Sequence, residues 1–268
     1  MLLSAKIVNK EINLMLLALS FFTRIPVNIR AEVDAEMLNN ASRYFALIGI
    51  LIGTCSALAF YLFELFLPAN IALLFAMVAS VLLTGAFHED GWADVWDGFG
   101  GGWSVENKLN IMKDSRLGTY GAAALFFILL LKYQALLVLI EPMLVNSTSV
   151  LAIFILGHCL SRVIATSLIA DMPYVSEDAN SKVKPLAQDL SVNSFLVLLA
   201  TGLSVLLLFL PLMATVQLVG VLLLLRWCIK KWFMKQLGGY TGDCLGAAQQ
   251  LSEVIIYLSL FVLLSESL

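Results

Sequence analysis

Long apolar runs restrict this chain to the class of helical membrane proteins. Each run holds roughly 20 residues, the length that an α-helix needs to cross a hydrocarbon layer of about 30 Å. The runs cover 44–67, 71–87, 122–140, 149–170, 195–210, 212–233 and 245–264. Hydrophobic residues make up 60% of the chain, whereas a soluble domain has about 45–50%. The sequence therefore predicts an all-α polytopic protein with about seven transmembrane helices (six to eight), forming a single integral-membrane domain over 1–268.

The segment before the first run is predicted to be cytoplasmic or interfacial and covers 1–43. Its own apolar stretch, 14–22, follows Lys6 and Lys10 and resembles a signal peptide superficially. No A-x-A cleavage pattern follows it, however, and a stretch of about ten residues is too short to cross the membrane. We expect a short interfacial or re-entrant helix that stays in the mature protein.

The distribution of lysine and arginine predicts the orientation in the membrane. Except for Lys132 and Arg162, these residues lie before the first run, in alternate connections between runs, or around the end of the run 212–233 (Arg226, Lys230, Lys231 and Lys235). The positive-inside rule places those segments in the cytoplasm. We therefore expect the N-terminus inside, the C-terminus outside, and three cytoplasmic loops that form one active-site face, at 88–121, 171–194 and 234–246.

Composition also excludes several functions. The chain contains no basic run typical of nucleic-acid binding, so we expect no nucleic-acid partner. Its four cysteines form no C-x-x-C pair, and we expect neither disulfides nor a thiol site. Membrane lipid is the partner that the apolar surface implies.

An acidic stretch in the second quarter of the chain carries the clearest functional signal. It contains six of the 19 acidic residues: Glu89, Asp90, Asp94, Asp97, Glu106 and Asp114. On a helix, the spacing of Asp90, Asp94 and Asp97 puts them within about 60° of one another. Clustered carboxylates repel unless a cation lies between them, and oxygen-only ligands favour Mg²⁺, with Mn²⁺ also suitable. The alternative is a solvated acidic helix face.

Small residues around these carboxylates suggest access for a phosphate ester. Gly91 and Gly98 lie beside the aspartates, and a bulky phosphate approaches the backbone closely only where side chains are absent. Asp243, near Thr241 in the glycine-rich sequence G-G-Y-T-G-D, is a further candidate ligand or base.

The end of the stretch adds groups that suit phosphate. Lys113, Asp114, Ser115 and Arg116 follow one another, just before Gly118. Arginine presents a planar fork to phosphate, and lysine supplies a point charge. Together with a metal, such groups can bind a diphosphate. The alternative is that the two cations only mark the end of a helix at the membrane face.

Charges inside the apolar runs are functional hypotheses in their own right. They are Glu64, Lys132, Arg162 and Glu253. Arg162 and Glu253 lie at similar depths, about 12–14 Å from the cytoplasmic ends of their helices. We expect them to face one another across a cavity, with His158 nearby. The alternative is that both side chains extend separately to the interface.

A metalloprotease interpretation fails on the sequence itself. His88 and Glu89 open an H-E pair, but Trp92 occupies the position of the second histidine. We expect His88 to be a hydrogen-bonding neighbour of the site.

Several long motifs resemble those of the cobalamin synthase family, the adenosylcobinamide-GDP ribazoletransferases. They read F-H-E-D-G-W-A-D-V-W-D-G-F-G-G-G, I-M-K-D-S-R-L-G-T-Y-G, G-G-Y-T-G-D-C-L-G-A and, near the N-terminus, L-S-F-F-T-R-I-P-V. Together they cover nearly the whole chain. The chain departs from many members at Tyr174-Val175-Ser176, where they carry Arg soon after the Tyr, so a phosphate contact from that loop is not expected.

The resemblance implies a Mg²⁺-dependent transferase of vitamin B12 synthesis in the bacterial inner membrane. It would transfer the adenosylcobinamide phosphate group from adenosylcobinamide-GDP to α-ribazole or its 5′-phosphate and release GMP. The oligomeric state, including association with other corrinoid-pathway enzymes, stays open.

The resemblance and the residues together give a provisional site. Metal ligands would be Asp90, Asp94, Asp97, Asp114 and Glu89. Groups that bind substrate or phosphate would be Lys113, Ser115, Arg116, Gly91, Gly98, Arg162 and Thr241. Asp97, Asp243 and Asp114 would take part in catalysis, with either Asp97 or Asp243 as the base, supported by His88 and Glu253.

Other functions share part of this pattern. CDP-alcohol phosphotransferases use a similar aspartate motif, but Asp94 stands where they carry arginine, and their second half, D-x-x-x-D, does not follow it. Intramembrane prenyltransferases also bind diphosphates with aspartates. A cation-coupled transporter would use the carboxylates and Arg162 as an ion path.

Overall fold

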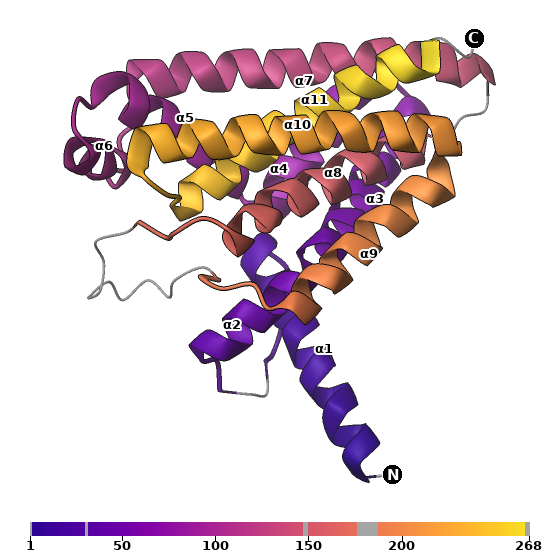
Figure 1. The fold of residues 1–268 in the computed structure, drawn as a ribbon. Helices are drawn as coiled ribbons and strands as arrows, with labels where there is room; N and C mark the ends of the chain where they lie inside the picture. Colours follow the sequence, from indigo (N-terminus) through magenta and orange to yellow (C-terminus); the bar gives the residue numbers. More distant parts are fainter. Residues whose placement is uncertain (1, 30–31, 147–149, 176–186, 266–268) are drawn as a thin grey trace.

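The computed structural model describes residues 2–29, 32–146, 150–175 and 187–265. All of the named secondary-structure elements within these residues are helices. The only strand-like pairing there is an isolated bridge between Tyr174 and Tyr240. The helices form one bundle, from which the N-terminal helix projects (Figure 1). The predicted all-α class is confirmed.

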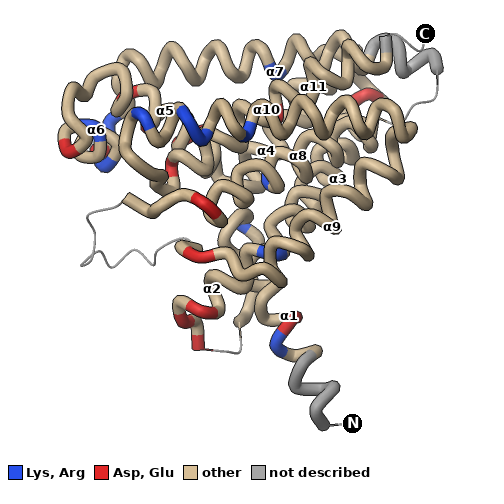
Figure 2. The backbone as a smooth tube through the Cα atoms, in the orientation of Figure 1, with Lys and Arg blue, Asp and Glu red and all other residues tan. Residues whose placement is uncertain are grey.

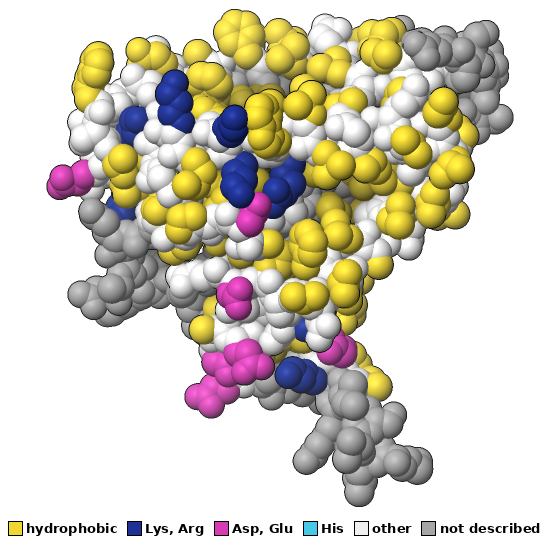
Figure 3. All heavy atoms as spheres, in the orientation of Figure 1, with side chains coloured by type: hydrophobic (Ala, Val, Ile, Leu, Met, Phe, Trp, Pro, Cys, Tyr) yellow, Lys and Arg dark blue, Asp and Glu magenta, His cyan; other side chains and the backbone are white. Residues whose placement is uncertain are grey.

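The seven predicted spans correspond to seven helices. They are α3 (Phe45–Glu64), α4 (Ala69–Thr84), α7 (Thr119–Asn146), α8 (Val150–Ser167), α9 (Val192–Phe209), α10 (Leu212–Leu237) and α11 (Gly242–Ser265). Six helical segments of the described chain are apolar and long enough to cross a membrane, and a seventh is reached if α4 and the next helix form one broken span. Large apolar side chains such as Leu62, Leu82 and Leu208 are exposed, and apolar side chains cover much of the bundle in Figure 3. Such a surface suits lipid.

The N-terminal helix is longer than predicted. α1 covers Leu2–Phe22, because no proline or glycine interrupts the residues before the apolar stretch. Leu14, Leu17 and Ala18 pack against the start of α3. Two short elements, α2 (Ala35–Ala41) and the 3-10 helix η1 (Ser42–Tyr44), lead into α3. α1 is not among the six segments that could cross a membrane.

Two of the predicted loops are largely helical, which corrects the prediction. Segment 88–121 forms α5 (Phe87–Gly101) and α6 (Val105–Met112), and segment 234–246 shrinks to residues 238–241 between α10 and α11. α10 ends at Gly238, which has a φ of 75°, a conformation that favours glycine. Of segment 171–194, residues 176–186 lie outside the described chain. Pro142 lies within α7.

Close helix contacts depend on glycine. A Cβ atom at Gly53 would lie 2.6 Å from the Phe154 carbonyl oxygen, and one at Gly49 would meet that of His158. Gly49 and Gly53, four residues apart, thus let α3 and α8 approach closely. Gly91 allows α5 to pack on α11 in the same way.

A sharp bend separates α4 from α5. Gly85 and Ala86 have φ angles of 68° and 59°, and the two helices meet at 86°. The backbone N–H of Arg24 donates to Leu83 O at 2.8 Å beside the bend. Because α5 carries four carboxylates, we treat it as a polar arm outside the apolar spans.

Candidate active site

The acidic face of α5 meets the start of α11. Asp90 is exposed, Asp94 is half-buried, and the backbone of Asp243 lies against Gly91, where an added Cβ would come within 2.8 Å of its carbonyl oxygen. The pKa of Asp94 is raised to about 7, first by burial and then by the negative charges of Asp243, Asp90 and Asp97. The structure therefore brings Asp90, Asp94 and Asp243 together at one helix crossing.

Asp97 has a different role in the structure. Its carboxylate accepts hydrogen bonds from the backbone N–H groups of Gly118, at 2.7 Å, and Gly121, at 2.8 Å. These N–H groups lie at the start of α7, where helical N–H groups lack partners within the helix. Asp97 therefore caps α7 and ties it to α5, and Gly118 and Gly121 leave the space for its carboxylate.

Asp114 pairs with its own neighbour. Arg116 donates to both of its carboxylate oxygens, including 2.9 Å from Nε to Oδ1. These hydrogen bonds lower the pKa of Asp114 to about 2. Asp114 is not among the charged residues that raise the pKa of Asp94. Lys113, Ser115 and Arg116 are exposed beside it, so the turn before α7 presents cations toward solvent.

The predicted glycines serve helix packing. A Cβ at Gly98 would meet Met112 Cγ at 2.5 Å and Lys108 O at 3.0 Å, so Gly98 seats α6 on α5. The expectation that Gly91 and Gly98 leave open space for phosphate is therefore wrong. Thr241 is buried, and its hydroxyl accepts from Cys244 N at 3.3 Å at the start of α11.

Other basic residues gather on α6 and α10 (Figure 2). Lys108 of α6 donates to Gln236 Oε1 at 2.6 Å and so joins α6 to α10. Arg226 and Lys230 of α10 pair with Asp171 at 2.6 and 2.7 Å. These contacts hold α10 against the connection that follows α8.

The carboxylates of α5 and α11 suit a hard divalent cation. Asp90 and Asp94 offer oxygen ligands only, as does Asp243, and this is the donor chemistry of Mg²⁺. Within the described residues, no three His, Cys, Asp or Glu side chains converge closely enough to bind a metal as they stand. Asp97 and Asp114 already accept hydrogen bonds from the start of α7 and from Arg116, so Asp90, Asp94 and Asp243 are the candidate carboxylates for a cation.

Glu89 and His88 turn away from the acidic face. Glu89 Oε1 accepts from Gln250 at 3.0 Å inside the bundle. His88 is buried and stacks on Phe22, with ring centroids 5.4 Å apart. Burial, followed by the positive charge of Arg162, holds the pKa of His88 well below its usual value. Neither side chain is placed with the trio.

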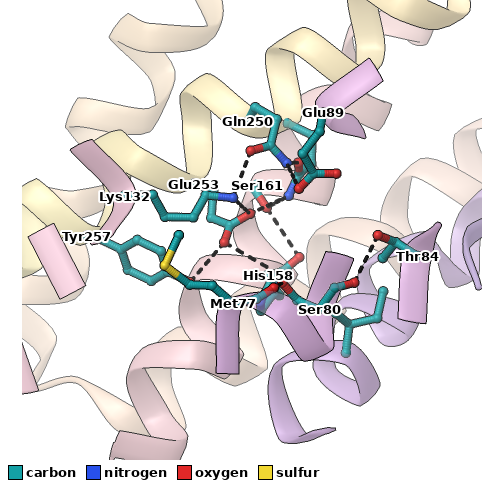
Figure 4. Close-up of polar contacts among 12 residues, drawn as sticks. Met77, Ser80, Thr84, Glu89, Lys132, His158, Ser161, Gln250, Glu253 and Tyr257 are labelled. Atoms are coloured by element: carbon teal, nitrogen blue, oxygen red, sulfur yellow. Dashed lines mark hydrogen bonds and ion pairs between the residues drawn. The ribbon is translucent and has the colours of Figure 1, made fainter. Parts of the chain in front are cut away.

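Arg162 and Glu253 border the same cavity, as predicted, but among the described contacts they do not form an ion pair with each other. Glu253 instead pairs with Lys132, at 3.3 Å between Nζ and Oε2 (Figure 4). Arg162 donates to its own helix, at His158 O, 2.8 Å away, and lies 5.7 Å from the centre of the Phe22 ring. His158 also borders this small cavity, as expected. Sequence reasoning did not identify Lys132 as the partner of Glu253, although an intramembrane cation implies a nearby anion.

Known proteins that are similar to this chain identify its family. The family model described as cobalamin-5-phosphate synthase matches residues 14–261. A protein of Shewanella frigidimarina (strain NCIMB 400), named adenosylcobinamide-GDP ribazoletransferase, is 54% identical over 93% of this chain and 94% of its own length. One of the same name from Shewanella piezotolerans (strain WP3 / JCM 13877) is 55% identical over 94% and 96%. No solved structure matches. The chain therefore belongs to the cobalamin-5-phosphate synthase family.

Proposed function

We propose that this protein transfers the adenosylcobinamide phosphate group from adenosylcobinamide-GDP to α-ribazole or α-ribazole 5′-phosphate. Relatives that match nearly the whole chain carry the name of this activity. The structural observation that carries the proposal is the trio Asp90, Asp94 and Asp243, whose like charges raise the pKa of Asp94. It lies partly on the helix that Asp97 ties to Gly118, just after the turn with exposed cations. Such a site suits a diphosphate ester.

The trio would hold Mg²⁺, with Asp90 and Asp94 contributed by α5 and Asp243 by α11. A bound divalent cation neutralises charge on a diphosphate as the leaving group departs. Arg116 and Lys113 would bind phosphate oxygens, and Asp114 orients the Arg116 guanidinium through the hydrogen bonds already described. These assignments keep Asp97 as the cap of α7.

In the reaction itself, a ribose hydroxyl of the acceptor attacks the phosphorus attached to cobinamide. A new P–O bond forms, the bond to the GMP phosphate breaks, and GMP leaves. A carboxylate accepts the hydroxyl proton. Asp94 and Asp243 are the candidates for this step, because burial and neighbouring carboxylates raise their pKa values to about 7 and about 6. A bound cation would lower the pKa of whichever carboxylate it contacts, so the base would be the one that does not bind it.

We also propose that the protein lies in the bacterial inner membrane with the N-terminus and the trio in the cytoplasm and the C-terminus outside. The distribution of Lys and Arg supports this orientation. Reporter domains fused at each end test it, because each reporter is active on one side only. A C-terminal reporter active in the cytoplasm would refute the orientation.

The decisive experiment uses purified protein in lipid vesicles. Incubation with adenosylcobinamide-GDP, α-ribazole and Mg²⁺ should release GMP and form the joined corrinoid. Chelation of the metal should stop both. Transport of a solute across the vesicle membrane without any GMP would refute the transferase and favour a transporter.

A further inference from the structure

A second polar cluster lies inside the bundle, and its members come from four different helices. All of them are buried: Glu89 on α5, Lys132 on α7, His158, Ser161 and Arg162 on α8, and Gln249, Gln250, Glu253 and Tyr257 on α11. Lys132 is 4% exposed and Glu253 is 1% exposed, so neither charge is solvated by bulk water. Figure 4 shows most of the cluster converging between the helices.

Gln250 lies at the centre of the connections to α5. Lys132 Nζ donates to Gln250 Oε1 at 2.7 Å, and Gln250 Nε2 donates to Glu89 Oε1 at 3.0 Å. An ammonium group can only donate, and an ionised carboxylate can only accept. The two neighbours therefore fix which way the Gln250 amide points, and the amide links the cation of α7 to the carboxylate of α5.

Glu253 is also held on several sides. It accepts from Tyr257 at 3.1 Å and from Gln249 at 2.8 Å, in addition to the ion pair with Lys132. Gln249 in turn donates to Ser161 of α8 at 3.0 Å. The side chains of α11 thus contact α5, α7 and α8 through polar groups.

The charges of the cluster balance. Lys132 and Arg162 are offset by Glu89 and Glu253, so no additional ion is needed for neutrality. Buried ion pairs seldom add net stability compared with apolar packing, and their best-attested use is to specify register. A bundle this apolar does not require such a cluster in order to fold.

The same helices carry the acidic trio. Glu89 directly precedes Asp90 on α5, and Gln250 lies seven residues, or about two turns, after Asp243 on α11. The contact between Glu89 and Gln250 therefore lies just behind the crossing of α5 and α11 where the trio gathers. A sliding or rotation of α5 would break this contact and would also change the spacing of the carboxylates.

We propose that Lys132, Gln250 and Glu253 are positioning residues, which act through Glu89 to fix α5 against α11 and so set the spacing of Asp90, Asp94 and Asp243. This inference rests on the proposed function of that trio. It assigns Glu89 to helix positioning and not to the metal.

An exchange of side chains tests the inference. Gln250→Glu places a second carboxylate against Glu89 and should lower GMP release by about 10²-fold, with a higher Mg²⁺ concentration needed for half-maximal rate. Adding Glu89→Gln places an amide donor at position 89, opposite the new carboxylate at position 250. Lys132 also contacts position 250 and would pair with that carboxylate. The double variant should recover at least tenfold over Gln250→Glu, and Glu89→Gln alone should keep most of the wild-type rate.

Two further measurements separate positioning from simple loss of folding. Ser56→Ala removes an equally buried hydroxyl that bonds only within α3, and it should leave the Mg²⁺ requirement unchanged. Thermal unfolding at several Mg²⁺ concentrations follows the same requirement without any substrate. If the wild type is stabilised by Mg²⁺ but releases no GMP, the proposed transferase fails while the positioning test continues. A Glu89→Gln rate that is as low as that of Gln250→Glu, with no recovery in the double variant, would overturn the inference.

Discussion

The acidic face of α5 and the polar cluster behind it use carboxylates in opposite ways. Asp90, Asp94 and Asp243 repel one another at a partly exposed crossing, whereas Glu89 and Glu253 are buried and face donors. Carboxylates without a neighbouring cation or donor can still bind a positively charged ligand, whereas carboxylates that already face donors bind one poorly. The contrast fits the two proposals made above, in which the first group binds the ligand and the second fixes the helices.

The largest expected effect comes from neutralising the exposed group. Asp94→Asn should lower GMP release by about 10³-fold, as expected when a group that stabilises the transition state is removed, while thermal stability stays the same or rises because repulsion is relieved. Rates measured in vesicles, together with unfolding curves, check this. Glu106→Gln on α6 is the matched control and should keep its activity. Near-normal turnover in Asp94→Asn would remove this residue from the site.

Breaking the buried group should lower stability, in addition to disturbing the spacing of the trio. Lys132→Met leaves Glu253 buried without its cation and should cost about 3–5 kcal/mol, visible as a lower unfolding temperature in detergent. Combining it with Glu253→Gln should recover most of the loss, because the uncompensated charge is gone. Equal instability of the single and double variants would show that the ion pair is not what matters.

The crossing of α5 and α11, which lies between the acidic trio and the buried cluster, can be altered by a substitution at Gly91. In Gly91→Ala, the new Cβ would meet the backbone of Asp243, and overpacking of this kind costs about 1–3 kcal/mol. Because α5 would move away from α11, GMP release should fall as well. Gly220→Ala on α10 is the control, since nothing lies within 4 Å of that position. A harmless Gly91→Ala would mean that α5 and α11 need not approach so closely.

The smallest effect is expected at Asp97. Asp97→Ala removes the acceptor for two N–H groups of α7 and should lower stability by about 1 kcal/mol, as for other helix caps. Asp97→Asn keeps one acceptor oxygen and should lose less. Both variants should release GMP faster than Asp94→Asn does. Turnover as low as in Asp94→Asn would return Asp97 to the catalytic group.

Sequence reasoning succeeded where periodicity and composition decide. The apolar runs located α3, α4 and α7 through α11 to within a few residues. The spacing of Asp90, Asp94 and Asp97 suits the helix that α5 forms, although the segment as a whole was expected to be a loop. It failed where a partner comes from a distant segment. Glu253 had two candidate cations, and spacing along the chain could not show that Lys132 lies nearer than Arg162. Nor could it show that Asp97 would meet the start of α7, or that Gly98 faces α6.

The packing of α5 has a consequence for the order of synthesis. Its neighbours α7 and α11 are made after it, and α11 lies at the C-terminal end of the chain (Figure 1). Until the ribosome has finished α11, Gly91 has no backbone to pack on, Glu89 lacks Gln250, and Asp94 lacks Asp243. The early helices of the nascent protein can thus enter the membrane before the proposed trio exists, and the trio is complete only after α11 has been made.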